Sequence, residues 1–549
     1  MIQLLTENRL LALLLALGSL LIIPNLADRP LWEDEASSAV LAKNIVSFGY
    51  PSAWDGRNLI VHENTGFKFD RSFAYYLRSW LEFYVISLFF LVLGPSTFAA
   101  RLPFAILGIL SIILFYRLVC RLADKKTAGL ATLLMIISVA VLLHIRQCAY
   151  YSLLTFITLL TTTLYINLTA KKTGKTVFYL ISALAALFYT HYLVFLGVLI
   201  GLVIHFLYLG IGKERLKTVI IASGILFILT APWFFSMGIL SHFAEFTQPI
   251  PFLFRFDNLV RYALYINNYL FPVILVPVFL YLRKRGAPLT PLPFIIISVL
   301  LVLTFAGPFP YFRYLMGIAP FFFYYLAVIF YKIKEKRNLW AYAFLAILVV
   351  TRIFNLLPLY PLKNIKFDRI TMPVSWQANP DVKTRLSLYN AYLNKETGHF
   401  WTYLPDYAYE LTHSFNGPLK GIVSFLKANS RPEDIVLTNY DNCSIIFYTG
   451  LRCAGRMTKK TPWLEEHLPS YIFSPKDAVW LIPRQGRDAY FFGKFLEENN
   501  IPEGSHILQR FSLNCQDIWL DSMPDPYYHL FREPNDGPPV IIFKKPAGL

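Results

Sequence analysis

Long apolar runs separated by short polar loops fill the first two thirds of the chain. A transmembrane helix needs about 20 residues, so these runs predict about eleven spans. The predicted spans are residues 10–26, 98–119, 127–143, 151–168, 177–189, 193–209, 219–237, 262–282, 292–305, 314–331 and 339–357. The first run follows Arg9 and has no A-x-A-like cleavage site after it, which favours a retained span over a signal peptide. The pattern therefore predicts a polytopic α-helical membrane protein.

Basic residues gather in every second loop between these runs. They are Arg121, Lys125, Lys126, Lys171, Lys172, Lys175, Lys213, Arg215, Lys217, Arg283, Lys284, Arg285, Lys332, Lys334, Lys336 and Arg337. Cytoplasmic loops carry an excess of Lys and Arg, so we expect these loops and the N-terminus to lie in the cytoplasm. The first outer loop, 27–97, and everything after residue 358 then face the periplasmic or extracytoplasmic side of the inner (plasma) membrane.

One apolar run, residues 75–93, is interrupted by Arg78 and Glu82. Placing both charges at the centre of a bilayer would cost several kcal/mol. We therefore expect this run to lie along the outer interface as one or two juxtamembrane helices.

The composition changes after the last predicted span. The segment "PLKGIVSFLKANS" is typical of a helix, whereas "DIVLTN", "IIFYTG", "AVWLIP" and "PVIIFKK" are typical of strands. We expect a transmembrane domain over 1–358, a connector over 359–416 and an extracytoplasmic α/β domain over 417–549. Cys443, Cys453 and Cys515 would lie in an oxidising compartment and allow one disulfide, with the pairing open.

Composition agrees with a membrane protein, because 56% of the residues are hydrophobic and only 15% are charged. A net charge of +17 would suggest nucleic acid as a partner of a soluble chain. Here the basic residues lie in short loops, and the sequence shows no basic face interleaved with aromatic residues. We therefore expect membrane lipids, and no nucleic acid, among the partners.

The segment "RPLWEDEASSAVLAKN" follows the first span and places Glu33, Asp34 and Glu35 in a row on the outer side. The simpler interpretation is a helix start, since acids in the first turn complement the helix dipole. The other interpretation is that these acids do chemistry.

Arginines in the predicted outer loops favour the second interpretation. They are Arg57, Arg101, Arg146 and Arg313. A guanidinium fork binds phosphate through paired hydrogen bonds, although a single arginine at a membrane surface also anchors to headgroups. Aromatic residues of the same loops, namely Trp32, Trp54, Tyr150 and Tyr192, either stack on a sugar or belong to the interfacial aromatic belt.

Several segments, in order and spacing, resemble the membrane glycosyltransferases of the C superfamily, and most closely the branch of protein O-mannosyltransferases and bacterial lipid A aminoarabinose transferases. They are "LWEDEASSAVLAKNI", "DRSFAYYLRSWLEFYVISLFFLVLGPSTFAARLPF", "HIRQCAYYSLLTFITLL", "YTHYLV" and "FRYLMGIAPFFFYYLAV". The resemblance implies transfer of one sugar from a polyprenyl-phosphate carrier to a lipid, glycan or protein acceptor on the outer face, with inversion.

The resemblance also implies roles for single residues. The acid of the "DE" pair after the first span is catalytic in such families, which corresponds to Asp34, with Glu35 as its partner. Many relatives have "EKPP" in the first loop, where this chain has "HENTGFKFDRSFAYY", so Glu63 and Lys68 are the candidates for that Glu and Lys.

Inverting transfer needs a base for the proton of the acceptor hydroxyl and a positive clamp for the departing phosphate. Asp34 is the expected base. The four outer-loop arginines, Arg57, Arg101, Arg146 and Arg313, are the expected phosphate ligands. The expected sugar or acceptor contacts are Glu33, Tyr150, Tyr151, His191, Tyr192, Glu63 and Lys68.

We expect no cofactor. His62, Glu63 and His191 are a candidate site for a divalent metal, but phosphate-binding or hydrogen-bonded interfacial histidines explain them equally well. The alternative function is a transporter or flippase of lipid-linked sugar, for which we would expect broken helices at matching positions in two halves. A sensor or scaffold is a third class, and it predicts no dependence on Asp34.

Overall fold

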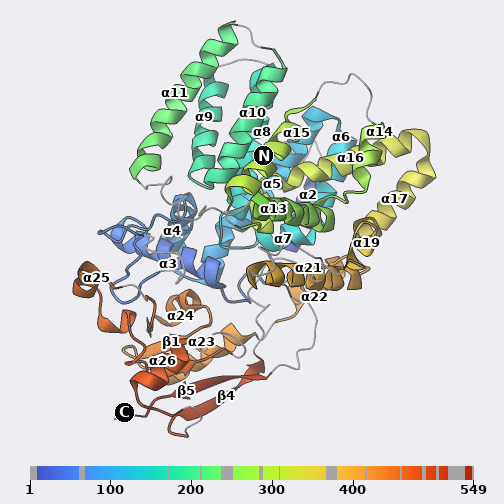
Figure 1. Cartoon of the computed structure of the whole chain (residues 1–549). Coiled ribbons are helices and arrows are strands. Elements are labelled where there is room, and N and C mark those ends of the chain that lie inside the picture. The colour runs from blue at the N-terminus through green and yellow to red at the C-terminus, as the bar shows by residue number, and fades with distance from the viewer. Residues whose placement is uncertain are drawn as a thin grey trace.

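The computed structural model describes most of the chain. The described residues are 9–60, 69–170, 174–210, 213–236, 252–282, 289–307, 309–365, 380–414, 417–457, 460–484, 490–502, 506–516, 529 and 538–546. These residues form a large helical part, drawn at the top of Figure 1, and a small sheet with its own helices at the bottom.

Helices account for the N-terminal part. They are α2 (Arg9–Ile22), α3 (Glu33–Phe48), α4 (Leu81–Leu93), α5 (Thr97–Leu122), α6 (Lys125–Ile136), α7 (Val139–Ile145), α8 (Tyr151–Ala170), α9 (Gly174–Phe188), α10 (Tyr192–Tyr208), α11 (Lys213–Ser236), α13 (Phe252–Tyr265), the π-helix η1 (Ile266–Leu270), α14 (Leu275–Leu282), α15 (Pro291–Ala306), the 3-10 helix η2 (Phe312–Leu315), α16 (Ala319–Lys336), α17 (Asn338–Val350), α18 (Ile353–Leu356) and α19 (Leu359–Lys363). The connecting helices α21 (Pro380–Gly398) and α22 (Leu404–Thr412) follow.

Three of the described helices are long and apolar enough to cross a membrane, or five if each of two bent pairs counts as one span. The three are Thr97–Leu122, Tyr151–Thr169 and Val219–Ser236. Shorter apolar helices, such as α2 and α10, fall on other predicted spans. The count of about eleven spans therefore stays a prediction.

Two predicted spans are not continuous. Residues 127–143 fall on α6 and α7, which are bent by 70° relative to each other, and residues 262–282 fall on a pair bent by 76°. Pro272 lies in the second break, where its missing N–H interrupts the helical ladder. Ser138 lies in the first break. The length of an apolar run does not indicate whether the helix axis changes direction within it. The sequence therefore did not predict either bend.

Close helix packing holds this part together where α10 meets α15. An added Cβ at Gly197 would lie 2.5 Å from the backbone of Val299, and one at Gly201 would lie 2.6 Å from the backbone of Ile295. The two glycines are four residues apart on one face of α10, the small-xxx-small spacing that lets two membrane helices approach closely.

Helices α3 and α4 pack together between the long helices and the C-terminal sheet (Figure 1). The run that we expected at the interface, 75–93, contains α4. Arg78 and Glu82, which interrupt that run, form an ion pair of 3.4 Å. The pair brings the two opposite charges together at the start of α4.

The C-terminal part contains one five-stranded sheet in the order β2-β1-β3-β5-β4. Its strands are β1 (Ile435–Thr438), β2 (Arg452–Cys453), β3 (Trp480–Ile482), β4 (Gln509–Gln516) and β5 (Pro539–Lys544). Strand β1 is parallel to β2 and β3, whereas β5 is antiparallel to β3 and β4. The accompanying helices are α23 (Pro418–Asn429), α24 (Asn442–Thr449), α25 (Pro462–His467), the 3-10 helix η4 (Ser470–Ile472) and α26 (Tyr490–Glu498).

Most of the elements expected here are confirmed, and one is wrong. The helix at "PLKGIVSFLKANS" and the strands at "DIVLTN", "AVWLIP" and "PVIIFKK" are present as α23, β1, β3 and β5. "IIFYTG" is not a strand but the end of α24. A short apolar run does not distinguish the two structures, and the helix is marked instead by Asp441 before it and by the left-handed Gly450 after it, at φ 68°.

The cysteine expectation is also corrected. All five cysteines, each of which lies among the described residues, are free. Cys453 lies on β2 and Cys515 on β4, at opposite edges of the sheet, so these two cannot pair. The division of the chain at residues 358 and 417 stays a prediction.

Candidate active site

The three consecutive acids begin α3 and have three different partners. Successive residues of a helix point about 100° apart, so a row of acids in its first turn fans out. Glu33 lies against α24, Asp34 against Arg313, and Glu35 against Arg101. The three carboxylates therefore have different environments and different possible roles.

Glu35 is completely buried and saturated with hydrogen bonds. Arg101 donates to both of its carboxylate oxygens, at 2.8 and 2.6 Å, and the backbone N–H of Cys148 donates at 2.7 Å. The remaining donors of Arg101 bind the carbonyl oxygens of Leu26, Arg29 and Pro30. All five N–H groups of Arg101 are thus engaged, and the pair holds the turn before α3 in place. This geometry favours a structural role for both residues, in place of the catalytic and phosphate-binding roles that the sequence predicted.

Asp34 is partly exposed and has an arginine as its partner. Its Oδ2 accepts a hydrogen bond of 2.6 Å from Arg313 Nη1, and 22% of its side chain and 19% of that of Arg313 are exposed. The guanidinium of Arg313 also lies 4.2 Å from the ring centre of Tyr311 and 5.9 Å from that of Trp32. The pair joins the first outer loop to the loop after the ninth predicted span. The sequence predicted both residues for one site, and the structure places them in contact.

A second arginine, Arg78, lies beside the first turns of α3, and the sequence did not predict it for the site. It donates to the hydroxyls of Ser37, at 2.6 Å, and Ser38, at 3.2 Å, and both hydroxyls in turn donate to the backbone oxygen of Asp34 at 3.0 Å. Its signal was present in the sequence, since an ionisable residue that interrupts an apolar run is a functional candidate by default. The sequence-based prediction used the charge of Arg78 only as an argument against a span over residues 75–93.

Aromatic side chains from three outer loops meet beside this pair. The ring of Tyr150 lies 4.8 Å from that of Tyr151 and 5.2 Å from that of His191, and His191 lies 5.2 Å from Tyr314, the neighbour of Arg313. Burial lowers the pKa of His191 to about 4, so its ring is neutral at pH 7. His191 Nδ1 accepts a hydrogen bond of 3.4 Å from Val194 N at the start of α10.

Several predicted site residues lie elsewhere. Arg57 is exposed in a turn with Asp55. The hydroxyl of Tyr192 accepts a hydrogen bond of 2.6 Å from Trp233. Arg146 donates to the hydroxyl of Tyr407, at 3.0 Å, and to the backbone carbonyl of Pro24, just after the end of α2.

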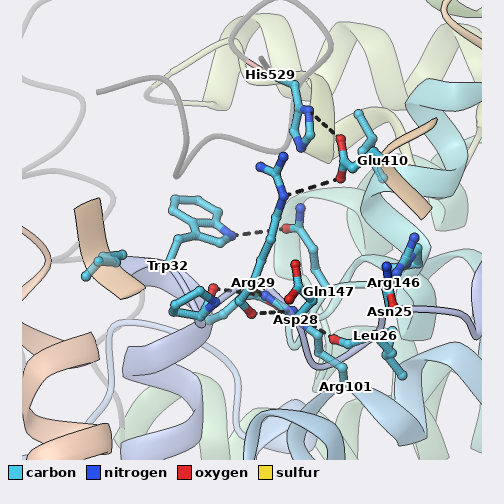
Figure 2. A pocket seen from close by; sticks show the side chains of 14 residues that line it. Asn25, Leu26, Asp28, Arg29, Trp32, Arg101, Arg146, Gln147, Glu410 and His529 are labelled. Atoms are coloured by element: carbon cyan, nitrogen blue, oxygen red, sulfur yellow. Dashed lines mark hydrogen bonds and ion pairs between the residues drawn. The ribbon is translucent and has the colours of Figure 1, made fainter. Parts of the chain in front are cut away.

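Arg146 lines a cavity that is partly open to solvent, on the Glu35 side of α3. In Figure 2, Arg29 and His529 both approach Glu410, at 3.4 and 3.2 Å, and Trp32 is joined to Gln147 across the cavity. Its other lining residues are Asn25, Leu26, Asp28, Pro30, Glu35, Arg101, Leu143 and Leu419. Arginines and carboxylates balance in this lining, so the cavity does not have the cationic excess of a phosphate site. Trp32 lines this cavity, and its ring centre also lies 5.9 Å from the guanidinium of Arg313.

Part of the predicted site lies outside the described residues. This applies to His62, Glu63 and Lys68. Of the candidate metal ligands only His191 is described, and the described residues contain no group of three or more His, Cys, Asp or Glu side chains that could hold a metal ion.

Comparisons with known proteins agree with the sequence resemblance. Residues 78–235 match the family described as dolichyl-phosphate-mannose-protein mannosyltransferase. A comparison with curated proteins finds no match.

Solved structures with a similar fold include ArnT from Cupriavidus metallidurans bound to undecaprenyl phosphate, with a TM-score of 0.55 and 11% sequence identity over 98% of both chains. The same protein in the apo state has a TM-score of 0.55 and 12% identity over 98% of both chains. The oligosaccharyltransferase AglB from Archaeoglobus fulgidus, in complex with an inhibitory peptide and a dolichol-phosphate, has a TM-score of 0.44 and 12% identity, over 87% of this chain and 69% of AglB. The family match and the ArnT-like fold together confirm the predicted resemblance to the membrane glycosyltransferases of the C superfamily.

Proposed function

We propose that the protein is an integral-membrane glycosyltransferase that moves a sugar from a polyprenyl-phosphate carrier to a lipid, glycan or protein acceptor on the outer face of the membrane. The observation that carries this proposal is the 2.6 Å ion pair between Asp34 and Arg313. It joins an acid to a guanidinium at the outer side of a chain whose fold resembles ArnT, which has been crystallised with undecaprenyl phosphate.

The proposed reaction inverts the configuration at the anomeric carbon. Asp34 takes the proton from the acceptor hydroxyl, the acceptor oxygen attacks the anomeric carbon, and the bond from that carbon to the phosphate oxygen breaks. Arg313 stabilises the negative charge that collects on the departing polyprenyl phosphate. An ion pair holds a carboxylate in its ionised form, which is the form that accepts a proton.

Other residues of the cluster have supporting roles in this proposal. Arg78 reaches Asp34 through the hydroxyls of Ser37 and Ser38, so it positions the base. Tyr150, which is 8% exposed, lies against Tyr151 and contributes its ring to the sugar site, whereas Tyr151 is 1% exposed and supports Tyr150 from behind. We expect no cofactor, and we place the site on the periplasmic side of the inner membrane.

A transfer assay on the purified full-length protein tests the proposal. The enzyme is incubated with a panel of radiolabelled polyprenyl-phosphate sugars, and the label is followed into lipid, glycan and protein fractions. We expect one donor to give label transfer with the wild-type protein, with and without EDTA, and very little with Asp34→Asn. Equal transfer by Asp34→Asn would contradict the assignment of the base. In sealed vesicles, a flippase would move the labelled carrier across the membrane without breaking the sugar–phosphate bond.

A further inference from the structure

Aromatic rings surround the guanidinium of Arg313. Its central carbon lies 4.2 Å from the ring centre of Tyr311, 5.8 Å from that of Tyr314 and 5.9 Å from that of Trp32. At such distances the quadrupole of an aromatic ring attracts a guanidinium, and the attraction is strongest for the nearest ring. Tyr311 therefore makes the strongest of these three contacts.

This environment differs from that of Arg101, the arginine that pairs with Glu35. All five N–H groups of Arg101 bind oxygen atoms of the protein. In Arg313 the hydrogen bond to Asp34 engages one of the five N–H groups, and most of the others lack an acceptor among the described residues. A ring contact restrains a guanidinium without using its N–H groups, and the Arg313 side chain is 19% exposed. These N–H groups therefore stay available to an anionic ligand.

Two of the three rings are held in place by further contacts. The indole of Trp32 donates through Nε1 to Gln147 Oε1 at 3.3 Å, which Figure 2 shows as a dashed line. The ring of Tyr314 lies against His191, with the ring centres 5.2 Å apart. Both rings thus have packing or hydrogen-bonding roles besides their contact with the guanidinium.

Tyr311 is more exposed. It stands at the N-cap of η2, its side chain makes no cap hydrogen bond, and 40% of the residue is exposed. Its ring lies 5.7 Å from that of Phe309, which is itself 47% exposed, and 5.8 Å from that of Tyr314. Substitutions at exposed positions usually change stability little. A loss of function on replacing this ring would therefore not arise from unfolding.

We propose that Tyr311 is a positioning residue for Arg313: its ring face holds the guanidinium beside Asp34 and leaves the free N–H groups available to the phosphate of the polyprenyl carrier. This inference rests on the proposed function. Tyr311 acts through the guanidinium and does not itself bind the phosphate. The ring performs this role, and the hydroxyl is not needed for it. The sequence-based prediction named Arg313 and not Tyr311.

Three variants of the full-length protein test this role. Tyr311→Phe keeps the ring and removes the hydroxyl, whereas Tyr311→Leu removes the ring. Tyr342→Leu is the matched control, because Tyr342 on α17 is 49% exposed and its ring centre lies 5.0 Å from Nζ of Lys334. In the label-transfer assay we expect Tyr311→Leu to lower kcat/KM for the donor roughly 3- to 30-fold, the range of a cation–π contact. Tyr311→Phe and Tyr342→Leu should stay close to the wild-type value.

Binding measurements test whether the effect passes through the phosphate. Undecaprenyl phosphate and undecaprenol have the same polyprenyl chain, and only the first has the anionic group that Arg313 would bind. We expect Tyr311→Leu to weaken the binding of undecaprenyl phosphate and to leave the binding of undecaprenol unchanged. Tyr311→Phe should bind both lipids as the wild-type protein does. A residue that only supports the fold would not separate the two lipids.

Several outcomes would overturn the inference. It is wrong if Tyr311→Leu keeps the wild-type kcat/KM, or if Tyr311→Phe is impaired as strongly as Tyr311→Leu. It is also wrong if Tyr311→Leu weakens the binding of undecaprenol equally, since the ring would then contact the lipid chain, or if Tyr342→Leu shows the same losses. Failure of the proposed function is distinguishable, because the wild-type protein would then transfer no sugar and would bind undecaprenyl phosphate no better than undecaprenol.

Discussion

At the scale of single residues, the three acids of the first loop differ in their partners, and Glu35 also differs in being fully buried. Glu35 is buried and accepts hydrogen bonds from three donors. Glu33 accepts a hydrogen bond from α24, whereas Asp34 pairs with an arginine and has 22% of its side chain exposed. Only a carboxylate that an acceptor hydroxyl can reach is able to take its proton. The structure therefore favours Asp34 as the base.

Amide substitutions separate the roles of Asp34 and Glu35. Asp34→Asn keeps the shape of the side chain but loses its basicity, so turnover should fall roughly 100- to 10,000-fold. Glu35→Gln leaves the buried Arg101 without a charged partner, and breaking such a pair costs about 3–5 kcal/mol of stability. We expect a lower Tm and yield for Glu35→Gln, with turnover per folded molecule closer to wild type. Thermal unfolding and the label-transfer assay measure the two effects. The reverse pattern would make Glu35 the base.

Arginine substitutions distinguish the phosphate clamp from an anchor to headgroups. Arg313→Ala removes a charged hydrogen bond, so kcat/KM for the donor should fall by the equivalent of about 1.5–3 kcal/mol, and Arg313→Lys should recover only part because it loses the fork. Arg57→Ala is the contrasting variant, since that side chain is exposed beside Asp55. Donor titrations of the label-transfer assay give these constants. Equal kinetics for Arg313→Ala and wild type, at normal protein levels, would leave Arg313 as an anchor.

The sequence contained enough information for Asp34 and Arg313, and too little for Arg78. Asp34 follows directly from its place after the first span, and Arg313 from a charge in an outer loop. The role of Arg78 depends on its reach to Ser37 and Ser38, 41 and 40 residues earlier, and periodicity carries no such information. For the same reason Arg101 was assigned to phosphate, although its five donors are used within the protein.

At the scale of helices, each of the two bent pairs contributes a side chain that lies against Phe312, the neighbour of Arg313. His144, on α7 after the first bend, lies 5.0 Å from the ring of Phe312, and Tyr269, in η1 before the second, lies 5.5 Å from it. Phe312 precedes Arg313. The length of the apolar runs predicted two spans but not the breaks within them. A break frees backbone N–H and C=O groups, and whether these groups find other hydrogen-bond partners depends on neighbouring segments.

Glycine substitutions test the packing of α10 on α15. Gly197→Leu would drive a side chain into the backbone of Val299, so we expect a loss of about 1–3 kcal/mol or more in stability. Gly224→Leu, in α11, is the control, because an added Cβ there meets nothing within 4 Å. Thermal unfolding in detergent, followed by size-exclusion chromatography, measures the difference. Similar unfolding temperatures for both variants would show that α10 and α15 are not tightly packed.

At the scale of the whole molecule, the C-terminal part is bonded to the loop that carries the acids. The hydrogen bond between Leu31 and Tyr448 joins residues 417 positions apart. No local pattern predicts such a contact, because hydrophobic periodicity indicates only the helices and strands on either side of it. The predicted orientation in the membrane, in contrast, rests on local charge, because Lys and Arg are concentrated in every second loop along the chain.

Single cysteines test this orientation in a background where Cys120, the one native cysteine that is not fully buried, is replaced by Ser. Ser47 on α3 and Asn429 on α23 are exposed and predicted to lie outside, and Asn338 at the start of α17 is exposed and predicted to lie in the cytoplasm. In spheroplasts, Ser47→Cys and Asn429→Cys should react with a membrane-impermeant maleimide, and Asn338→Cys should react only after permeabilisation. The opposite pattern would invert the molecule and place Asp34 and Arg313 in the cytoplasm, away from a carrier whose sugar is presented on the outer face.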